Sequence, residues 1–126
     1  MKVDRLHLVM GLLWLLAGMA LGEHMGRTAD HAQMPTHAHI MLVGGVLPIL
    51  WAILNRVWKM GSGLVAWAQL ALHHAGAAVM IVALYKLYGG GNGETLGPIL
   101  GISAMLVILA TVLMLFMAIR ARPDAS

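Results

Sequence analysis

Charged side chains interrupt this otherwise apolar chain at only a few places. Between them lie four runs without Asp, Glu, Lys or Arg, at residues 6–22, 31–55, 60–85 and 95–119. A helix of about 20 residues rises about 30 Å, which is the thickness of the hydrocarbon layer of a bilayer. We therefore predict a single all-α domain, residues 1–126, folded as an integral membrane four-helix bundle. The expected spans cover approximately residues 6–22, 36–54, 64–88 and 95–119.

The composition supports this class. The chain has no cysteine, 60% of its residues are hydrophobic and 10% are charged, whereas soluble domains carry about 25% charged residues. A soluble enzyme, a disordered chain and a disulfide scaffold are therefore excluded. The first apolar run is longer than the usual hydrophobic region of a signal peptide, about 7–15 residues. We expect it to be retained as a span.

The net charge of +3 does not indicate a nucleic-acid partner, because the basic residues stand at the ends of the spans. On one side of the four-span arrangement are Lys2, Arg5, Arg56, Lys59, Arg120 and Arg122, and on the other Arg27 and Lys86. Cytoplasmic loops carry the excess of Lys and Arg. We therefore expect a multi-pass protein of a bacterial inner membrane with both termini in the cytoplasm. The 23–36 and 89–94 loops would face the periplasm.

Proline, glycine and tryptophan mark the ends and faces of the spans. Pro35 suits the first turn of the second span, where its missing N–H would have had no partner. Small residues four apart permit close helix approach, as in Gly18 with Gly22 and Gly97 with Gly101. A tight turn is expected at Gly61-Ser62-Gly63. Around it, an interfacial aromatic belt is predicted from Trp51, Trp58 and Trp67.

Seven histidines in so apolar a chain call for an explanation. His7 is expected at a membrane interface, and His24 and His31 in a solvated loop. Four others lie deeper, namely His37, His39, His73 and His74. Ionisable side chains inside a membrane are costly and usually face a bundle interior, a partner or a ligand. For His73 and His74 a ligand or proton-relay role stands beside hydrogen-bonded packing.

Helical spacing separates the two outer histidines. His37 shares a stripe with Met41, whereas His39 lies on a roughly opposite apolar stripe with Val43, Val46 and Leu50. The Gly44-Gly45 pair clears volume beside them, which would suit either a flat macrocycle or close helix packing.

Neutral imidazole binds haem iron, copper and zinc. No carboxylate lies within the spans, which argues against a carboxylate-rich zinc or di-iron site, and without Cys-x-x-Cys-His covalent c-type haem is excluded. Non-covalent haem, a His/Met copper site, or both remain. The copper interpretation rests on His24, Met25, His31, Met34, His37, His39 and Met41, because thioether and imidazole suit copper.

The pattern Gly18-Met19-x-x-Gly22-x-x-Met25-Gly26, followed by Asp30, Pro35 and His37-Ala38-His39, resembles a family of small bacterial four-span proteins. These look like one third of haem–copper oxidase subunit I. The resemblance covers residues 10–50. The family pattern continues with Asn and Trp where this chain has Met41 and Gly45.

The resemblance implies a homotrimer, since three four-span units would rebuild the twelve spans of subunit I. It implies a haem-binding His at the outer start of the second span, for which His39 is the better-placed residue. It also makes His73-His74 similar to a pair of copper ligands. The His-linked tyrosine and the double-His helix of the oxidases are not evident, so oxygen reduction is not carried over.

We therefore expect a protein that binds haem b through His39, His37, His73 and His74, for electron transfer with an unidentified donor or acceptor or for binding a diatomic ligand. The alternative is a periplasm-facing copper-binding or copper-handling protein. A third possibility is a structural subunit whose histidines only form hydrogen bonds.

Overall fold

The computed structural model describes residues 1–60 and 63–122. Regular structure in these residues is entirely helical: α1 (Val3–Thr28), α2 (Met34–His39), the π-helical segment η1 (Ile40–Val46), α3 (Leu47–Val57), α4 (Leu64–Tyr88) and α5 (Gly93–Arg120). Because α2, η1 and α3 follow without a break, they form one rod, Met34–Val57. Four rods are therefore long and apolar enough to cross a membrane. This confirms the prediction of an all-helical chain with four membrane-length helices.

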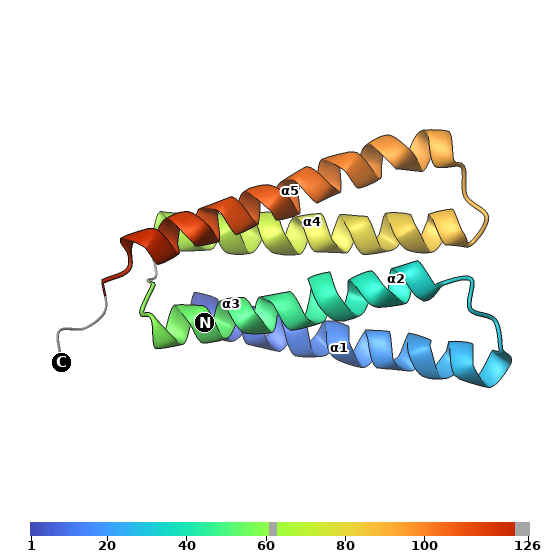
Figure 1. Cartoon of the computed structure of the whole chain (residues 1–126), viewed down its shortest axis with the longest axis horizontal. Helices are drawn as coiled ribbons and strands as arrows, with labels where there is room; N and C mark the ends of the chain where they lie inside the picture. Colours follow the sequence, from blue (N-terminus) through green and yellow to red (C-terminus); the bar gives the residue numbers. More distant parts are fainter. Residues whose placement is uncertain (61–62, 123–126) are drawn as a thin grey trace.

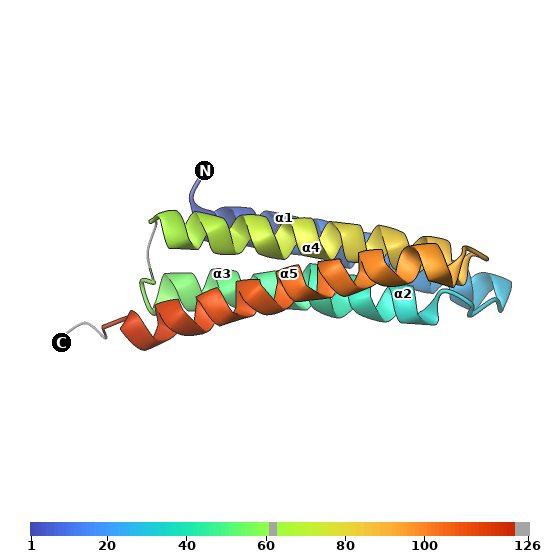
Figure 2. The same ribbon diagram turned by 90° about the horizontal axis from the view of Figure 1, so that it is seen from above.

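The rods form two antiparallel hairpins that lie against each other (Figure 1). The first hairpin consists of α1 and the α2–η1–α3 rod, and the second of α4 and α5. The helix α4 faces the first hairpin, while α5 packs along α4 on the outside (Figures 1 and 2). We call the end at which α1 begins and α5 ends the terminal end. The opposite end, which holds residues 29–33 and 89–92, is the loop end.

The loop end is shorter than the sequence predicts. The helix α1 continues to Thr28, so the expected 23–36 loop shrinks to residues 29–33. One turn is held by the Glu23–Arg27 ion pair, with 3.1 Å between Oε1 and Nε, and Ala29 then ends the helix with φ of 56°. Pro35 lies in the first turn of α2, as predicted. At the terminal end, Gly61 and Ser62 of the expected turn lie outside the described residues.

All four rods contribute to a hydrophobic core cluster near the terminal end, formed by Val3, Trp51, Ala66, Met114 and Met117. Here the aromatic-belt prediction is wrong in one member. Trp58 and Trp67 are 51% and 42% exposed, but Trp51 is only 7% exposed. The reason is a polar partner inside the bundle, because Trp51 Nε1 donates to His73 Nδ1 at 3.2 Å.

The two glycine pairs behave differently. A Cβ placed on Gly18 would meet Met41, and one on Gly22 would lie 2.8 Å from Cε1 of His37, so α1 approaches the second rod closely there. Apart from its own helix backbone and chain neighbours, no atom of the described residues lies within 4 Å of a Cβ built on Gly97 or Gly101. The first pair packs as predicted, whereas no described part of this chain packs against the second.

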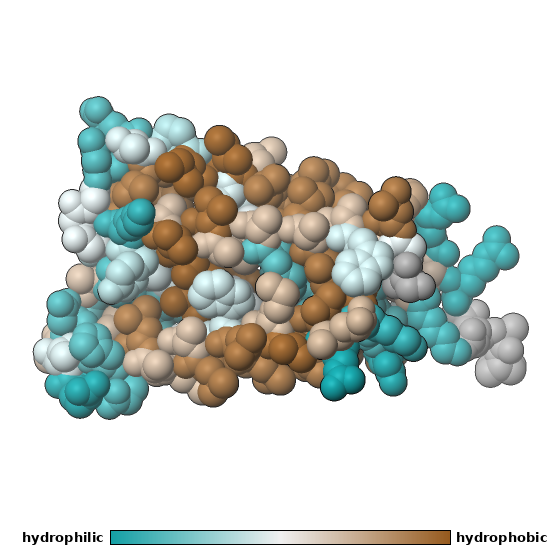
Figure 3. All heavy atoms as spheres, turned by 180° about the vertical axis from the view of Figure 1, so that it is seen from behind, coloured by the Kyte–Doolittle hydropathy of each residue, from teal (hydrophilic) through white to brown (hydrophobic). Residues whose placement is uncertain are grey.

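Apolar side chains also cover the middle of the outer surface, with hydrophilic residues gathered towards both ends (Figure 3). On α5 the exposed apolar residues include Ile102, Met105, Val112, Leu115 and Ile119. In water such a surface would be unfavourable, whereas hydrocarbon solvates it well. The surface is therefore consistent with four rods that cross a bilayer.

Candidate functional site: two groups of histidines

The histidines fall into three environments. His24 and His31 are exposed, His37 and His39 are half-buried near the loop end, and three others are buried between the rods. The buried three are His7, His73 and His74, which are 0%, 0% and 6% exposed. Two groups of histidines are therefore candidate sites: the buried group between the rods and the half-buried group at the loop end.

The π-helical segment η1 leaves one backbone carbonyl, that of Val43, to accept a hydrogen bond from His73. The N–H of Leu47 donates to the carbonyl of Leu42, five residues back. The next residue, Pro48, has no N–H to continue this pattern, and its ring would crowd the carbonyl four residues back in an α-helix. The carbonyl of Val43 is thereby left without its helical partners. His73 Nε2 supplies the missing hydrogen bond at 2.9 Å.

The two hydrogen bonds of His73 fix its tautomer. Trp51 Nε1–H can only donate, so Nδ1 of His73 accepts, and Nε2–H of His73 donates to the carbonyl of Val43. The imidazole is neutral and both nitrogens are engaged. A metal or haem iron could bind His73 only after one of these bonds breaks, and as placed His73 joins α3, η1 and α4.

His7 and His74 form a second hydrogen-bonded unit. His7 Nδ1 lies 3.0 Å from His74 Nε2, and His7 Nε2 lies 2.8 Å from Oε1 of Gln69. The expectation that His7 sits at an interface is wrong, because the ring points from α1 towards α4 and is fully buried. Its buried partner Gln69 was also missed by sequence reasoning.

A sequence signal for His7 did exist. The buried residues of α1 are Val3, His7, Gly11, Gly18 and Met25, spaced four or seven apart. His7 therefore lies on the same stripe as Gly18, which was recognised as a packing residue. A histidine on a glycine-lined stripe points at the neighbouring helix, because residues four and seven apart share one helix face.

The buried group is not fully satisfied. Among residues 1–60 and 63–122, the buried side-chain atoms His74 Nδ1, Gln69 Nε2 and Asn55 Oδ1 find no hydrogen-bond partner. Buried polar atoms without a partner are rare, and each calls for an explanation. Two of the three belong to the chain formed by Gln69, His7 and His74.

At the loop end, both histidines of α2 are anchored through Nδ1. His37 Nδ1–H donates to the carbonyl of Gly18 at 2.9 Å, and His39 Nδ1–H donates to the carbonyl of Pro35 at 2.7 Å. A neutral ring that donates at Nδ1 carries a lone pair on Nε2. In the part of the chain that the structure describes, neither Nε2 atom has a hydrogen-bond partner. The arrangement leaves both Nε2 atoms available to a ligand.

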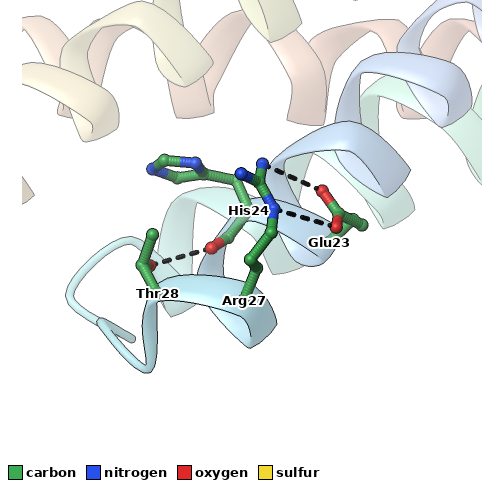
Figure 4. Close-up of polar contacts among 4 residues, drawn as sticks. All are labelled: Glu23, His24, Arg27 and Thr28. Atoms are coloured by element: carbon green, nitrogen blue, oxygen red, sulfur yellow. Dashed lines mark hydrogen bonds and ion pairs between the residues drawn. The ribbon is translucent and has the colours of Figure 1, made fainter.

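The side chains of the copper interpretation are spread over α1, the loop and the second rod. His24 is exposed, and only its backbone carbonyl takes part in the contacts of Figure 4, accepting from Thr28 Oγ1 at 2.8 Å. Met25 is 3% exposed, Met34 is 46% exposed, and Met41 packs against Gly18. Within residues 1–60 and 63–122, no three or more His, Cys, Asp or Glu side chains are grouped so that they could hold a metal ion.

The volume expected beside Gly44 and Gly45 is filled by the protein itself. A Cβ on Gly44 would lie 2.9 Å from Trp14, and one on Gly45 would collide with the side chain of Leu15. These glycines therefore serve close packing of α1 against η1. The space beside these two glycines is therefore not free for a macrocycle.

Comparison of the chain with protein-family models, with curated proteins and with solved structures finds no match in any of the three.

Proposed function

We propose that this chain is a bacterial inner-membrane protein that binds haem b through His39, with His37 in support, for electron transfer or for binding a diatomic ligand. In this proposal the loop end faces the periplasm, the termini are cytoplasmic, and three copies assemble around the bound haem groups. The resemblance to haem–copper oxidase subunit I motivates the cofactor and the number of copies.

The orientation of the loop-end imidazoles carries the proposal. Histidines that bind a metal usually donate their second ring N–H to a carbonyl or carboxylate, which fixes the tautomer and aims the lone pair. His39 and His37 have this arrangement, with Pro35 and Gly18 as acceptors at 2.7 Å and 2.9 Å. His73 differs, because both of its nitrogens are already engaged. The loop-end pair would therefore be better suited than His73 to hold haem iron.

The surroundings distinguish His39 from His37. The His37 ring lies against Gly22 of α1, between two helices. The stripe that contains His39 continues through Val46 and Leu50, which are 41% and 45% exposed. A flat apolar group held by His39 would lie along this outer face, where a second copy of the chain could cover it. This chain would contribute the imidazole and an apolar wall, and the haem iron would supply reversible electron transfer or diatomic binding.

The test is the visible spectrum of the protein purified from membranes in mild detergent. The native chain should show a Soret band, and His39→Ala should abolish it or change the coordination spectrum. His37→Ala should have a smaller effect. His24→Ala is the matched control, because His24 is an exposed histidine at the same end, and it should leave the spectrum unchanged.

A native protein without a Soret band would overturn the haem proposal. The same preparation should then be analysed for metals. Stoichiometric copper that is lost in His24→Ala and His31→Ala would support the copper interpretation, which also involves Met25, Met34 and Met41.

A further inference from the structure

The hydrogen-bond chain of Gln69, His7 and His74 can exist in two opposite polarities. In the first, His74 Nε2–H donates to His7 Nδ1, and His7 Nε2–H donates to Gln69 Oε1. In the second, the Gln69 amide has rotated and donates to His7 Nε2, and His7 Nδ1–H donates to His74 Nε2. Both rings are neutral in each polarity, because a histidine nitrogen can donate or accept according to the tautomer. The two arrangements contain the same number of hydrogen bonds.

The partnerless atoms lie at the two ends of this chain. Within the part of the chain that the structure describes, buried His74 Nδ1 has no partner at one end, and buried Gln69 Nε2 has none at the other. Because its second amide atom is not held, the Gln69 side chain can rotate without breaking another hydrogen bond. Since His74 Nδ1 is not held either, it can accept or release a proton.

His73 lacks this freedom, although its ring centroid is only 5.2 Å from that of His74. The indole of Trp51 cannot accept and the carbonyl of Val43 cannot donate, so their bonds to His73 have one polarity. The buried cluster therefore contains one hydrogen-bond chain whose polarity can reverse, formed by Gln69, His7 and His74. Beside it, the hydrogen bonds of His73 have a fixed polarity.

We propose that Gln69, His7 and His74 form a proton relay between the terminal end and the middle of the bundle. A proton taken up at His74 Nδ1 is followed by transfer of the His74 Nε2 proton to His7 Nδ1. His7 then releases its Nε2 proton to water from the terminal end, and the rotated Gln69 amide donates to the bare Nε2. One proton enters and one leaves. The reverse sequence carries a proton in the opposite direction.

The placement of the residues gives the relay its direction. Gln69 is near the start of α4 at the terminal end, and His74 is five residues further along, which corresponds to about 7.5 Å of helix rise. At the start of α1, a groove of about 500 Å³ lies between α1 and α3, and its lining includes Asp4, Arg56 and Leu8, the residue after His7. His7 does not line this groove and is fully buried, so release of its proton to water requires a local opening of the bundle beside Leu8.

The charges around the relay are few. From α1 and α3, Asp4 and Arg56 form an ion pair of 3.0 Å at the terminal end, and Arg5 is exposed. From α4 the nearest titratable group is His73, and α5 has no ionisable side chain between residues 95 and 119. No acidic side chain of the described residues is hydrogen-bonded to His7 or His74, so neither ring is held in the charged form.

The relay goes beyond the proposed haem function and does not depend on it, because it uses neither His37 nor His39. The test uses the full chain, labelled with ¹⁵N-histidine and reconstituted in phosphatidylethanolamine–phosphatidylglycerol vesicles. Site-assigned solid-state NMR distinguishes protonated from bare ring nitrogens. For His7 and His74 we expect averaged signals between the two positions. For His73 we expect a protonated Nε2 and a bare Nδ1.

Gln69→Glu should stop the exchange, because a carboxylate accepts at His7 Nε2 and cannot donate in its ionised form. The His7 Nε2 signal should shift fully to the protonated position. Gln33→Glu is the matched control: Gln33 donates to the carbonyl of Tyr85 at the loop end, and its substitution should leave the His7 signals unchanged. Fixed single tautomers for both His7 and His74 in the native chain would overturn the relay. Unshifted His7 signals in Gln69→Glu would also overturn it.

Discussion

Trp51 and His73 show how a single polar contact can decide where a large side chain lies. The Trp51 indole has an N–H that requires an acceptor when it is buried, and His73 Nδ1 provides one at 3.2 Å. His73 in turn satisfies a carbonyl that Pro48 has deprived of its helical partner. The contact therefore connects α3 to α4 and holds η1 in place.

Replacing Trp51 with phenylalanine should lower the free energy of unfolding by about 1 kcal/mol, because the buried Nδ1 of His73 would lose its donor. Denaturant unfolding in detergent micelles would measure the difference. Trp58→Phe is the matched control, since Trp58 is 51% exposed and exposed substitutions usually change stability by less than about 0.5 kcal/mol. Equal effects of the two substitutions would contradict the role assigned to the Trp51 N–H.

The sequence predicts the burial and the hydrogen-bond partners of individual residues less completely than it predicts the helices. The depth of His73 and His74 followed from their place within an apolar run, and both are buried. The hydrogen-bonding partner of each depends on how α1 and α3 pack against α4, which periodicity along one helix does not specify. For this reason His7 and Trp51 were expected at interfaces and are found inside. The tautomer of His73 could be deduced only once both of its partners were known.

Among the helices, η1 has a local cause that can be tested. Pro48 lacks an N–H, and its ring crowds the preceding turn of an α-helix; a π-helical turn accommodates this and leaves the Val43 carbonyl to His73. The sequence showed Pro48 within the second span but gave no sign of the π-helical register. The π-helical register also depends on a hydrogen-bond donor of α4, the Nε2–H of His73.

Pro48→Ala should restore a backbone N–H and favour an unbroken α-helix. Val43 would then regain a backbone donor, and the Nε2–H of His73 would lose its acceptor. The ¹⁵N signal of His73 Nε2 should shift accordingly. Pro98→Ala serves as control, because Pro98 lies in α5, away from His73, and should leave this signal unchanged. An unchanged His73 signal in Pro48→Ala would show that Pro48 does not determine the register.

Close approach of α1 to the second rod depends on Gly11. A Cβ there would lie 2.9 Å from the backbone carbonyl oxygen of Gly45, and backbone cannot move aside as a flexible side chain can. Gly11→Ala should therefore destabilise the fold by about 1–3 kcal/mol. Gly26→Ala is the control in the same helix, since nothing lies within 4 Å of its Cβ position. Denaturant unfolding of both variants should separate them, and equal stability would contradict the close contact.

The four-rod architecture was the part of the molecule most accessible from sequence. Charge-free runs determine the number of membrane-length helices almost alone, because length and hydropathy decide whether a helix can cross hydrocarbon. The third predicted span, residues 64–88, coincides with α4, whereas α1 extends six residues beyond its predicted end at Gly22. Polar residues such as Glu23 and Arg27 suggested a loop there, but they pair along one helix face and prolong the helix.

The proposed orientation in the membrane can be tested in a chain that has no cysteine. Thr95→Cys places one thiol at the loop end, and Trp58→Cys places one at the terminal end; both positions are exposed. Six of the eight basic residues lie on the terminal side, so that side should be cytoplasmic. In intact cells an impermeant maleimide should label Thr95→Cys and not Trp58→Cys. The opposite pattern would reverse the orientation and place His39 on the cytoplasmic side.

The proposed homotrimer makes a prediction about the outer helix. On α5, the Cβ positions of Gly97 and Gly101 have no atom of another described element within 4 Å. Bulk added there should therefore not disturb the single chain, although it would prevent close approach by another helix. Native mass spectrometry in mild detergent should show trimers for the native chain and mainly monomers for Gly101→Leu. Helix content should be the same in both, since leucine favours helix over glycine by about 0.8–1 kcal/mol.

Leu115→Ala is the control for altered apolar surface, because it shortens an exposed side chain of α5 without blocking close approach. A native chain that remains monomeric at all concentrations would contradict the trimer, and trimers that persist in Gly101→Leu would place the interface on another face.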